Sequence, residues 1–199
     1  MKKLLIATNN PGKLAEINSL LQDLSLDLLH PAVLGLDLEV EEDGISYSEN
    51  ALKKAKEFCQ ISNLPTLADD SGLEVVVLNN APGLHSRRYA AGIAVTDADR
   101  RVQLLKNLSG KPRPWMARFR AAIAVAKPGG QTILAEGICP GEIIPEERGT
   151  GGFGYDPIFL VENTGKTMAE LSLVDKNQLS HRARAVTKLI PGLLEFLDS

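Results

Sequence analysis

The sequence predicts an α/β fold with a mixed β-sheet. Residues 3–8 form an apolar run typical of a buried strand, and a polar loop and a helix with apolar side chains at helical spacing follow it. Residues 115–126 and 131–139 are predicted to form two long strands joined by the short turn 127–130, and strands joined in this way are antiparallel. The sheet is therefore expected to be mixed rather than purely parallel.

Length and composition favour one globular domain over residues 1–199, of which 44% are hydrophobic. The formal net charge of -3 gives no electrostatic reason to expect binding to nucleic acid or to a membrane surface. Cys59 and Cys139 lie in apolar segments without disulfide or zinc-type spacing, which favours buried free thiols in a reducing cytoplasm. The apolar run after Lys3 is too short for a signal segment or a membrane span.

The loop at residues 9–12 is the first candidate binding site. It follows the carboxyl end of a strand, where α/β proteins bind ligands, and the N–H groups of the next helix favour phosphate. Lys13, where we expect that helix to begin, adds a positive charge. The loop is not a Walker motif, because Leu14 stands where serine or threonine is required. An ordinary strand-to-helix turn is the alternative.

The next segment carries a short strand at 26–29, a loop or edge at 31–39 and an acidic turn at 41–44. Ser46 is predicted to cap the following helix, with Glu49 as its capping-box partner. Charged residues of this helix, including Lys54 and Glu57, are expected to form its outer face.

Two adjacent carboxylates, Asp69 and Asp70, interrupt an apolar segment. Ser71 and Gly72 follow, and a second apolar run occupies 73–78, a pattern that predicts strand, turn and strand. Two carboxylates at a strand end lose hydration and repel each other unless positive charge lies on them. Mg²⁺ prefers carboxylate oxygen and would supply that charge; an acidic turn exposed to water is the alternative.

A basic loop at 84–90 precedes a helix that is expected to start near residue 96 and to stop at 109–114. Residues 149–154 have the spacing G-x-G-x-x-G, but a strand-like run at 158–161 follows in place of a helix, which argues against dinucleotide binding. Phe153 and Tyr155 beside these glycines are suited to stacking on a flat ring, and a glycine-rich hairpin is the alternative.

The C-terminal part contains a helical turn at 167–171, a polar segment at 172–180 and a last helix that we expect Pro191 and Gly192 to interrupt. His181 and Arg182 stand at the start of that helix, where the dipole disfavours cations unless an anion is present. The pair indicates an anion site or a base-contacting site, and a buried structural histidine is the alternative.

Five motifs occur in register along nearly the whole chain. They are Thr8-x-Asn10-x-x-Lys13, Glu42 before Glu49-Asn50-Ala51-x-x-Lys54-Ala55, Ala68-Asp69-Asp70-Ser71-Gly72, Gly151-Gly152-Phe153-Gly154-Tyr155-Asp156-Pro157 and Ser180-His181-Arg182. Together they resemble the inosine triphosphate pyrophosphatase family, which includes the bacterial dITP/XTP pyrophosphatases.

The resemblance implies a two-lobed α/β domain around a long mixed β-sheet with flanking helices, with the active site in the cleft between the lobes. It implies a homodimer and Mg²⁺-dependent hydrolysis of ITP, dITP and XTP to the nucleoside monophosphate and pyrophosphate, which cleans the nucleotide pool. The alternatives are a pyrophosphatase for modified pyrimidine nucleotides, a nucleotide sensor without turnover, and a redox protein that uses residues 149–154.

The resemblance also implies residue roles. Glu42 and Asp70 carry over as Mg²⁺ ligands, and Asp70 orients or deprotonates the attacking water with help from Asp69. The implied substrate-binding residues are Thr8, Asn9, Asn10, Pro11, Gly12, Lys13, Lys54, Ser71, Phe153, Gly154, Tyr155, Asp156, Lys176, His181 and Arg182. A donor such as Arg182 facing the 6-oxo group would disfavour adenine, so Arg182→Ala is expected to reduce ITP hydrolysis more than stability.

Overall fold

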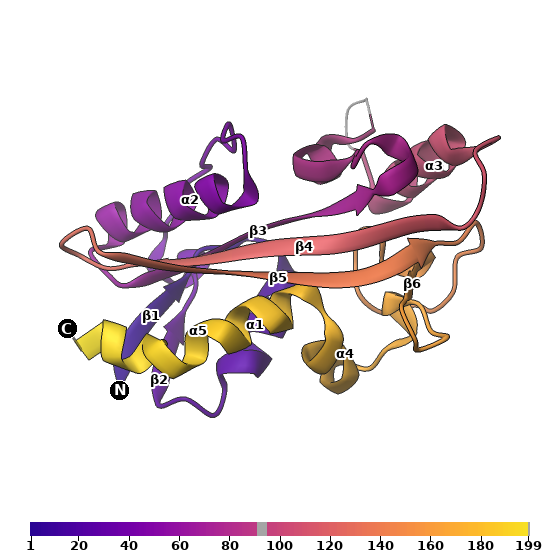
Figure 1. Ribbon diagram of the computed structural model, residues 1–199. Helices are drawn as coiled ribbons and strands as arrows, with labels where there is room; N and C mark the ends of the chain where they lie inside the picture. Colours follow the sequence, from indigo (N-terminus) through magenta and orange to yellow (C-terminus); the bar gives the residue numbers. More distant parts are fainter. Residues whose placement is uncertain (91–94, 199) are drawn as a thin grey trace. The chain divides into compact units, whose positions relative to one another are not determined.

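The computed structural model describes residues 1–90 and 95–198. In it, the chain forms a mixed β-sheet flanked by helices (Figure 1). Within these residues the strand order is β2-β1-β3-β4-β5-β6. The strands are β1 (Lys2–Ile6), β2 (Leu26–Leu29), β3 (Thr66–Val75), β4 (Trp115–Ala126), β5 (Thr132–Ile143) and β6 (Phe159–Val161). β1 pairs in parallel with β2 and β3, whereas β5 and β6 are antiparallel. These pairings confirm the predicted α/β class with a mixed sheet.

The chain divides into two compact units, each with its own apolar core. The first comprises the described residues of Met1–Ser71, Ala121–Gly137 and His181–Ser199, and the second those of Gly72–Arg120 and Ile138–Ser180. The two units agree with the predicted two-lobed fold. The single domain over residues 1–199 and the cleft between lobes stay predictions.

Among its described residues, the first unit contains three helices, α1 (Pro11–Leu21), α2 (Tyr47–Ser62) and α5 (His181–Asp198), and the short 3-10 turn η1 (Pro31–Leu34). α1 and α5 contact each other on one side of the strands, and α2 lies on the other side (Figure 1). Leu4, Ile17, Leu67, Ile123 and Val186 are among the buried residues of this core. Helices on both faces explain why β1 is a continuous apolar run rather than an alternating one.

The second unit contains α3 (Asp97–Leu108), α4 (Leu173–Leu179) and four 3-10 turns, η2 (Val76–Leu78), η3 (Gly83–Arg88), η4 (Asp156–Ile158) and η5 (Met168–Glu170), within the described residues. Its core includes Leu73, Leu104, Trp115 and the aromatic pair Phe119 and Phe159, whose ring centroids are 4.5 Å apart. The glycine-rich segment leads into η4 and β6 and not into a helix, which removes the structural basis of the redox alternative.

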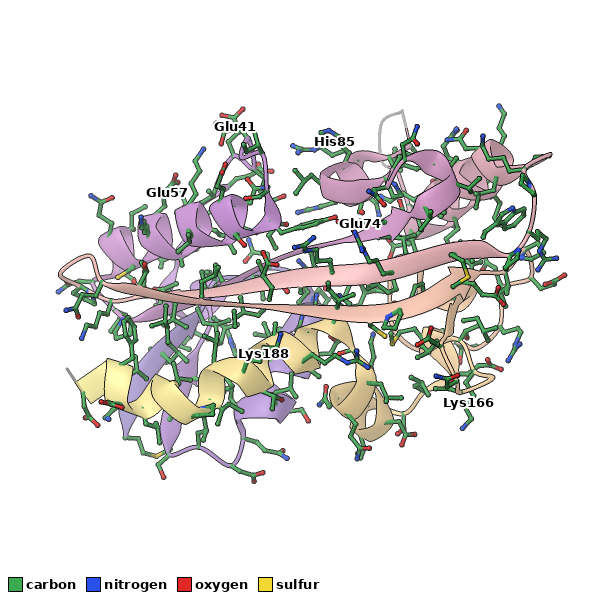
Figure 2. The ribbon with its side chains drawn as sticks, viewed as in Figure 1. Glu41, Glu57, Glu74, His85, Lys166 and Lys188 are labelled. Carbon is green, nitrogen blue, oxygen red and sulfur yellow. The ribbon has the colours of Figure 1, made fainter. Side chains whose placement is uncertain are left out.

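Helix capping follows the sequence closely. The side chain of Ser46 accepts a hydrogen bond from the backbone N–H of Glu49, as predicted, but Glu49 is not its capping-box partner, because the Glu49 carboxylate accepts from the N–H of Ile45 instead. Thr96 and Asp99 form a reciprocal capping box on α3. Figure 2 shows Glu57 on the side of α2 that faces away from the strands of its unit, as expected for an outer charged face. Lys54 departs from that expectation, as described below.

Several predicted boundaries are wrong, including those of β3, α5 and α1. β3 runs unbroken through Asp69–Gly72, where we predicted a turn, because protein partners on both faces take up the two carboxylates. α5 continues through Pro191, since Leu189 and Leu193 on either side of it are anchored in the core. α1 begins at Pro11, two residues before Lys13, because Asn10 acts as its N-cap.

Cys59 and Cys139 are buried thiols that are not joined in a disulfide, as predicted. In the part of the chain that the structure describes, none of the helices has both the length and the apolar character that crossing a membrane requires.

Candidate active site

Most predicted site residues lie in the first unit, around the carboxyl end of β1 and the middle of β3. The loop 8–13, the irregular segment that contains Glu42, the start of α2, residues 69–71 of β3 and the start of α5 all belong to it. Phe153, Gly154, Tyr155, Asp156 and Lys176 belong to the second unit and are described separately below.

The loop between β1 and α1 is held by its own side chains. Oδ1 of Asn10 accepts hydrogen bonds from the N–H groups of Gly12 at 2.9 Å and Lys13 at 3.1 Å, and Oγ1 of Thr8 accepts one from the N–H of Asn10 at 3.2 Å. Asn9 and Pro11 are exposed. The cap therefore satisfies two of the N–H groups that a phosphate would otherwise bind.

Asp69 is the centre of a buried ion cluster. Its carboxylate pairs with the ammonium group of Lys13 and accepts a hydrogen bond from Nε of Arg182 at 3.0 Å. The same guanidinium pairs with Glu16 and donates from Nη2 to Oγ of Ser71 at 3.1 Å. Arg182 is 1% exposed, so the cluster fixes the start of α5 to β3 and α1 from inside the unit.

The charges in this cluster sustain one another. Burial opposes ionisation of Asp69, but Arg182 and Lys13 outweigh it and hold the pKa of the carboxyl well below its ordinary value. Burial also opposes the charge of Arg182, yet Asp69 and Glu16 keep its pKa above the usual value. Burial lowers the pKa of Lys13 despite its pairing with Asp69. A carboxylate with so low a proton affinity is a weak base, and its contacts favour a structural role.

Asp70 has different partners from its neighbour. Its Oδ2 accepts a hydrogen bond from Nδ2 of Asn50 on α2 at 3.0 Å, and its Oδ1 accepts one from the N–H of Ser71 at 2.9 Å. Successive side chains of a strand point to opposite faces, so Asp69 is directed to the side of α1 and α5 and Asp70 to the side of α2. The two carboxylates that adjoin in sequence are thereby separated.

Burial raises the pKa of Asp70, and the negative charge of Glu42 adds to this effect. Lys13 and Lys54 act in the opposite direction without cancelling it. A carboxylate with a raised pKa binds a proton more readily than an ordinary aspartate, which suits it to general-base work near neutral pH.

Glu42 and Lys54 form an ion pair, with Oε1 and Nζ 2.5 Å apart. Nζ of Lys54 also donates to the backbone oxygen of Asp69 at 3.0 Å, which turns this side chain inward from α2 and not onto its outer face. The pair brings a second carboxylate and a cation into the electrostatic environment of Asp70.

These carboxylates fit a Mg²⁺ site only in part. Residues 1–90 and 95–198 contain no group of three or more His, Cys, Asp or Glu side chains placed to hold a metal ion. Mg²⁺ at nucleotide sites commonly takes one or two carboxylates and completes its shell with water and substrate phosphate. The donor set of Asp70 and Glu42 matches that pattern, and their mutual repulsion is the charge problem that a cation would relieve.

Close packing fixes the start of α5, where His181 is 5% exposed. A Cβ on Gly137 of β5 would lie 2.6 Å from the backbone nitrogen of Ala185 and nearer still to the backbone oxygen of His181. Only glycine lets the helix approach the strand this closely, so Gly137 sets the position from which His181 and Arg182 project.

The second unit contains a smaller buried cluster. Oδ2 of Asp156 accepts hydrogen bonds from Nζ of Lys176 at 2.7 Å and from the N–H of Phe153 at 3.0 Å. Nζ of Lys176 lies 5.0 Å from the centroid of the Phe153 ring. Tyr155 donates from its hydroxyl to the backbone oxygen of Ser86 at 2.9 Å, and burial raises its pKa. The segment 153–156 is therefore a defined loop and not a flexible linker.

Sequence reasoning missed the parts played by Asn50 and Glu16. Asn50 belongs to the motif Glu49-Asn50-Ala51-x-x-Lys54-Ala55, but no role was predicted for its side chain. Glu16 lies on the same side of α1 as Lys13, three residues away, and an acidic residue among the apolar positions of that helix was the available signal.

Comparisons with known proteins identify a family, related sequences and related structures. The sequence model of the Ham1 family matches residues 4–192. A protein of Geobacter sulfurreducens named dITP/XTP pyrophosphatase is 46% identical, over 95% of this chain and 95% of that protein. One of the same name from Desulfotalea psychrophila is 41% identical, over 98% of this chain and 88% of that protein. The structure of a HAM1 protein from Coxiella burnetii has a TM-score of 0.88 at 39% identity, covering 98% of this chain and 100% of that chain.

Proposed function

The chain belongs to the Ham1 family, and we propose that it is an enzyme that hydrolyses dITP, ITP and XTP to the nucleoside monophosphate and pyrophosphate. The names of the relatives support the substrate class. The observation in the structure that carries the proposal is the environment of Asp70, a buried carboxylate with a raised pKa among two lysines and a second carboxylate.

In the proposed reaction Asp70 accepts a proton from a water molecule whose oxygen attacks the α-phosphorus. The bond between the α-phosphorus and the bridging oxygen breaks, and pyrophosphate leaves with the electron pair. Asn50 and the N–H of Ser71 hold the two oxygens of Asp70 from fixed directions, so the carboxylate is oriented before substrate arrives. The assisting role of Asp69 stays a prediction, which its low proton affinity does not favour.

Positive charge for the triphosphate comes from Lys13 and Lys54, both of which act electrostatically on Asp70. Glu42 and Asp70 would hold a Mg²⁺ ion, which neutralises phosphate charge and lowers the pKa of a bound water. Before the nucleotide binds, Glu42 and Lys54 neutralise each other as an ion pair, and the negative charge of the triphosphate would then compete with Glu42 for Lys54. Thr8, Asn9, Asn10, Pro11 and Gly12 remain the proposed phosphate-binding loop, which would bind phosphate through groups other than the N–H groups of Gly12 and Lys13 that Asn10 caps.

For the base we propose the loop 153–156 of the second unit, with Lys176 fixed beneath the ring of Phe153. A flat aromatic ring and a set of oriented backbone groups are suited to enclosing a purine. Ser71, His181 and Arg182 are proposed nucleotide contacts. The guanidinium of Arg182 already donates hydrogen bonds to Asp69 and Ser71 and pairs with Glu16. Part of this network must therefore rearrange before Arg182 can donate to the 6-oxo group of the base, as proposed.

The test is pyrophosphate release from ITP, dITP, XTP, GTP, ATP and a modified pyrimidine triphosphate, with Mg²⁺ and with EDTA. Release from ITP, dITP and XTP alone, abolished by EDTA, is the expected result. Release of orthophosphate in place of pyrophosphate would contradict cleavage at the α-phosphate. Turnover of the pyrimidine alone would favour the alternative pyrophosphatase, and binding without turnover would favour the sensor.

We further propose a cytoplasmic homodimer. Sedimentation equilibrium on the purified chain tests the dimer, and a monomer at assay concentration would contradict it.

A further inference from the structure

Helix α3 holds the loop 153–156 by both backbone groups of one residue. Oδ2 of Asp97 accepts a hydrogen bond from the N–H of Gly154 at 2.7 Å, and Nη1 of Arg101 donates one to the carbonyl oxygen of Gly154 at 2.9 Å. Asp97 and Arg101 are four residues apart, so they project from the same side of the helix. All of these groups belong to the second unit.

The two side chains of α3 are themselves held in place. Nε and Nη2 of Arg101 donate to the two carboxylate oxygens of Glu147 at 2.8 and 3.0 Å, a two-point contact that fixes the plane of the guanidinium. The Arg101 side chain is 13% exposed, whereas that of Glu147 is 44% exposed. Asp97 lies in the first turn of α3, where its charge is favoured by the dipole, and it pairs with Arg100.

Gly154 has φ of 62°, in the left-handed region, which glycine adopts as readily as other conformations, so the residue by itself does not fix the path of the backbone. A Cβ at this position would meet nothing within 4 Å, so the positive φ and not a close approach is the reason that glycine suits it. The hydrogen bonds to its N–H and to its carbonyl oxygen hold the residue in this conformation. Phe153 and Asp156 flank the glycine, and their mutual contact depends on the path of the chain between them.

We propose that Asp97 and Arg101 are positioning residues that hold Gly154, and through it Phe153 and Asp156, in the conformation that binds the purine base. The inference rests on the proposed function, because it assigns the loop 153–156 to the base. Loss of either contact loosens the base-binding loop and leaves the environment of Asp70 unchanged. The effect therefore falls on KM and on base selectivity, and not on kcat.

The experiment compares Arg101→Gln with Lys106→Gln, which removes the same charge from an exposed position of the same helix. For Arg101→Gln we expect KM for ITP to rise about tenfold, the effect of losing a charged hydrogen bond, with kcat within about twofold of the wild-type value. Lys106→Gln should match the wild type. Unchanged KM and an unchanged ITP to GTP ratio of kcat/KM in Arg101→Gln would overturn the proposal.

Two further variants keep the test decisive. Asp97→Asn retains an oxygen that can accept from Gly154 and should recover most of the KM lost in Asp97→Ala. The Asp97→Ala and Arg101→Gln effects should be less than additive, because both residues hold the same glycine. A fall in kcat with unchanged KM would contradict the proposal. Absence of pyrophosphate release by the wild type would instead refute the proposed function, so the two failures are distinguishable.

Discussion

Nδ2 of Asn50 donates a hydrogen bond to Oδ2 of Asp70 at 3.0 Å, and Oδ1 of the same amide accepts one from the N–H of Gly44 at 2.8 Å. One buried side chain thus joins the proposed base to the backbone two residues after Glu42. A Cβ on Gly44 would lie 2.6 Å from Oδ1 of Asn50, so this approach requires glycine. The relative placement of Glu42 and Asp70 therefore depends on Asn50.

Asn50→Ala should lower kcat and raise the Mg²⁺ concentration needed for half-maximal activity, each by about tenfold, as is usual for groups that orient a metal ligand. Mn²⁺ binding to the nucleotide-free protein, followed by electron paramagnetic resonance, should weaken in parallel. Gln60→Ala, at an exposed position of the same helix, is the control. Wild-type metal binding in Asn50→Ala would rule out this role.

Asp70→Asn should remove activity and spare the fold. The substitution preserves shape and removes the proton acceptor, so kcat should fall by roughly 10²–10⁴-fold. Removing a buried charge whose pKa is raised favours the folded state, whereas the amide can replace only one of the two accepting oxygens, so these effects oppose each other and the thermal midpoint should change little. Near-normal turnover by a folded Asp70→Asn protein would contradict the assignment of Asp70 as the general base.

Asp69→Asn should have the opposite profile, with a cost in stability. It leaves the buried Arg182 and the half-buried Lys13 without their shared carboxylate, and breaking a buried pair in this way costs about 3–5 kcal/mol. The same reasoning changes the expectation for Arg182→Ala, which should destabilise the chain substantially as well as reduce ITP hydrolysis. Urea unfolding of both variants measures the free-energy change, and wild-type midpoints would show that the cluster contributes nothing to stability.

The contribution of Asp69 should depend on pH in a defined direction. Its folded pKa lies below the ordinary value of 3.8, so the ionised form stabilises the native state at every pH above that value. As the pH falls below 3.8 toward the lowered pKa, this contribution declines by about 1.4 kcal/mol per pH unit. The stability difference between wild type and Asp69→Asn should therefore be constant above pH 5 and shrink in acid. A difference that grows in acid would contradict the lowered pKa.

Gly137→Ala should push the start of α5 away from β5, because the added carbon collides with the backbone of His181 and Ala185. We expect a loss of stability of about 1–3 kcal/mol, as for other overpacked sites, and a fall in activity through His181 and Arg182. Gly192→Ala in the same helix is the matched control, since its Cβ meets nothing within 4 Å and alanine favours helix by about 1 kcal/mol. Equal stability changes in the two variants would remove the packing role of Gly137.

Local signals in the sequence were sufficient for much of the fold. Apolar periodicity located α1, α2, α3, α5 and the long strands, and the cap at Ser46 and the helix start near residue 96 were correct because capping involves residues three positions apart. The predicted turn at Asp69–Gly72 was wrong for a related reason. Asp, Ser and Gly favour turns locally, and only distant partners such as Arg182 and Asn50 make an extended strand acceptable there.

The sequence by itself determined the α/β class, the positions of most elements and the group of residues that carry the resemblance to a nucleotide pyrophosphatase. It could not separate the roles of Asp69 and Asp70, which look equivalent as neighbours in a motif. The tertiary structure decided this, because strand alternation directs one carboxylate to Arg182 and the other to Asn50. Charged partners from distant segments then lower the pKa of Asp69, whereas the pKa of Asp70 stays raised. These partners come close to the two carboxylates only in the folded chain, so the sequence alone does not identify them.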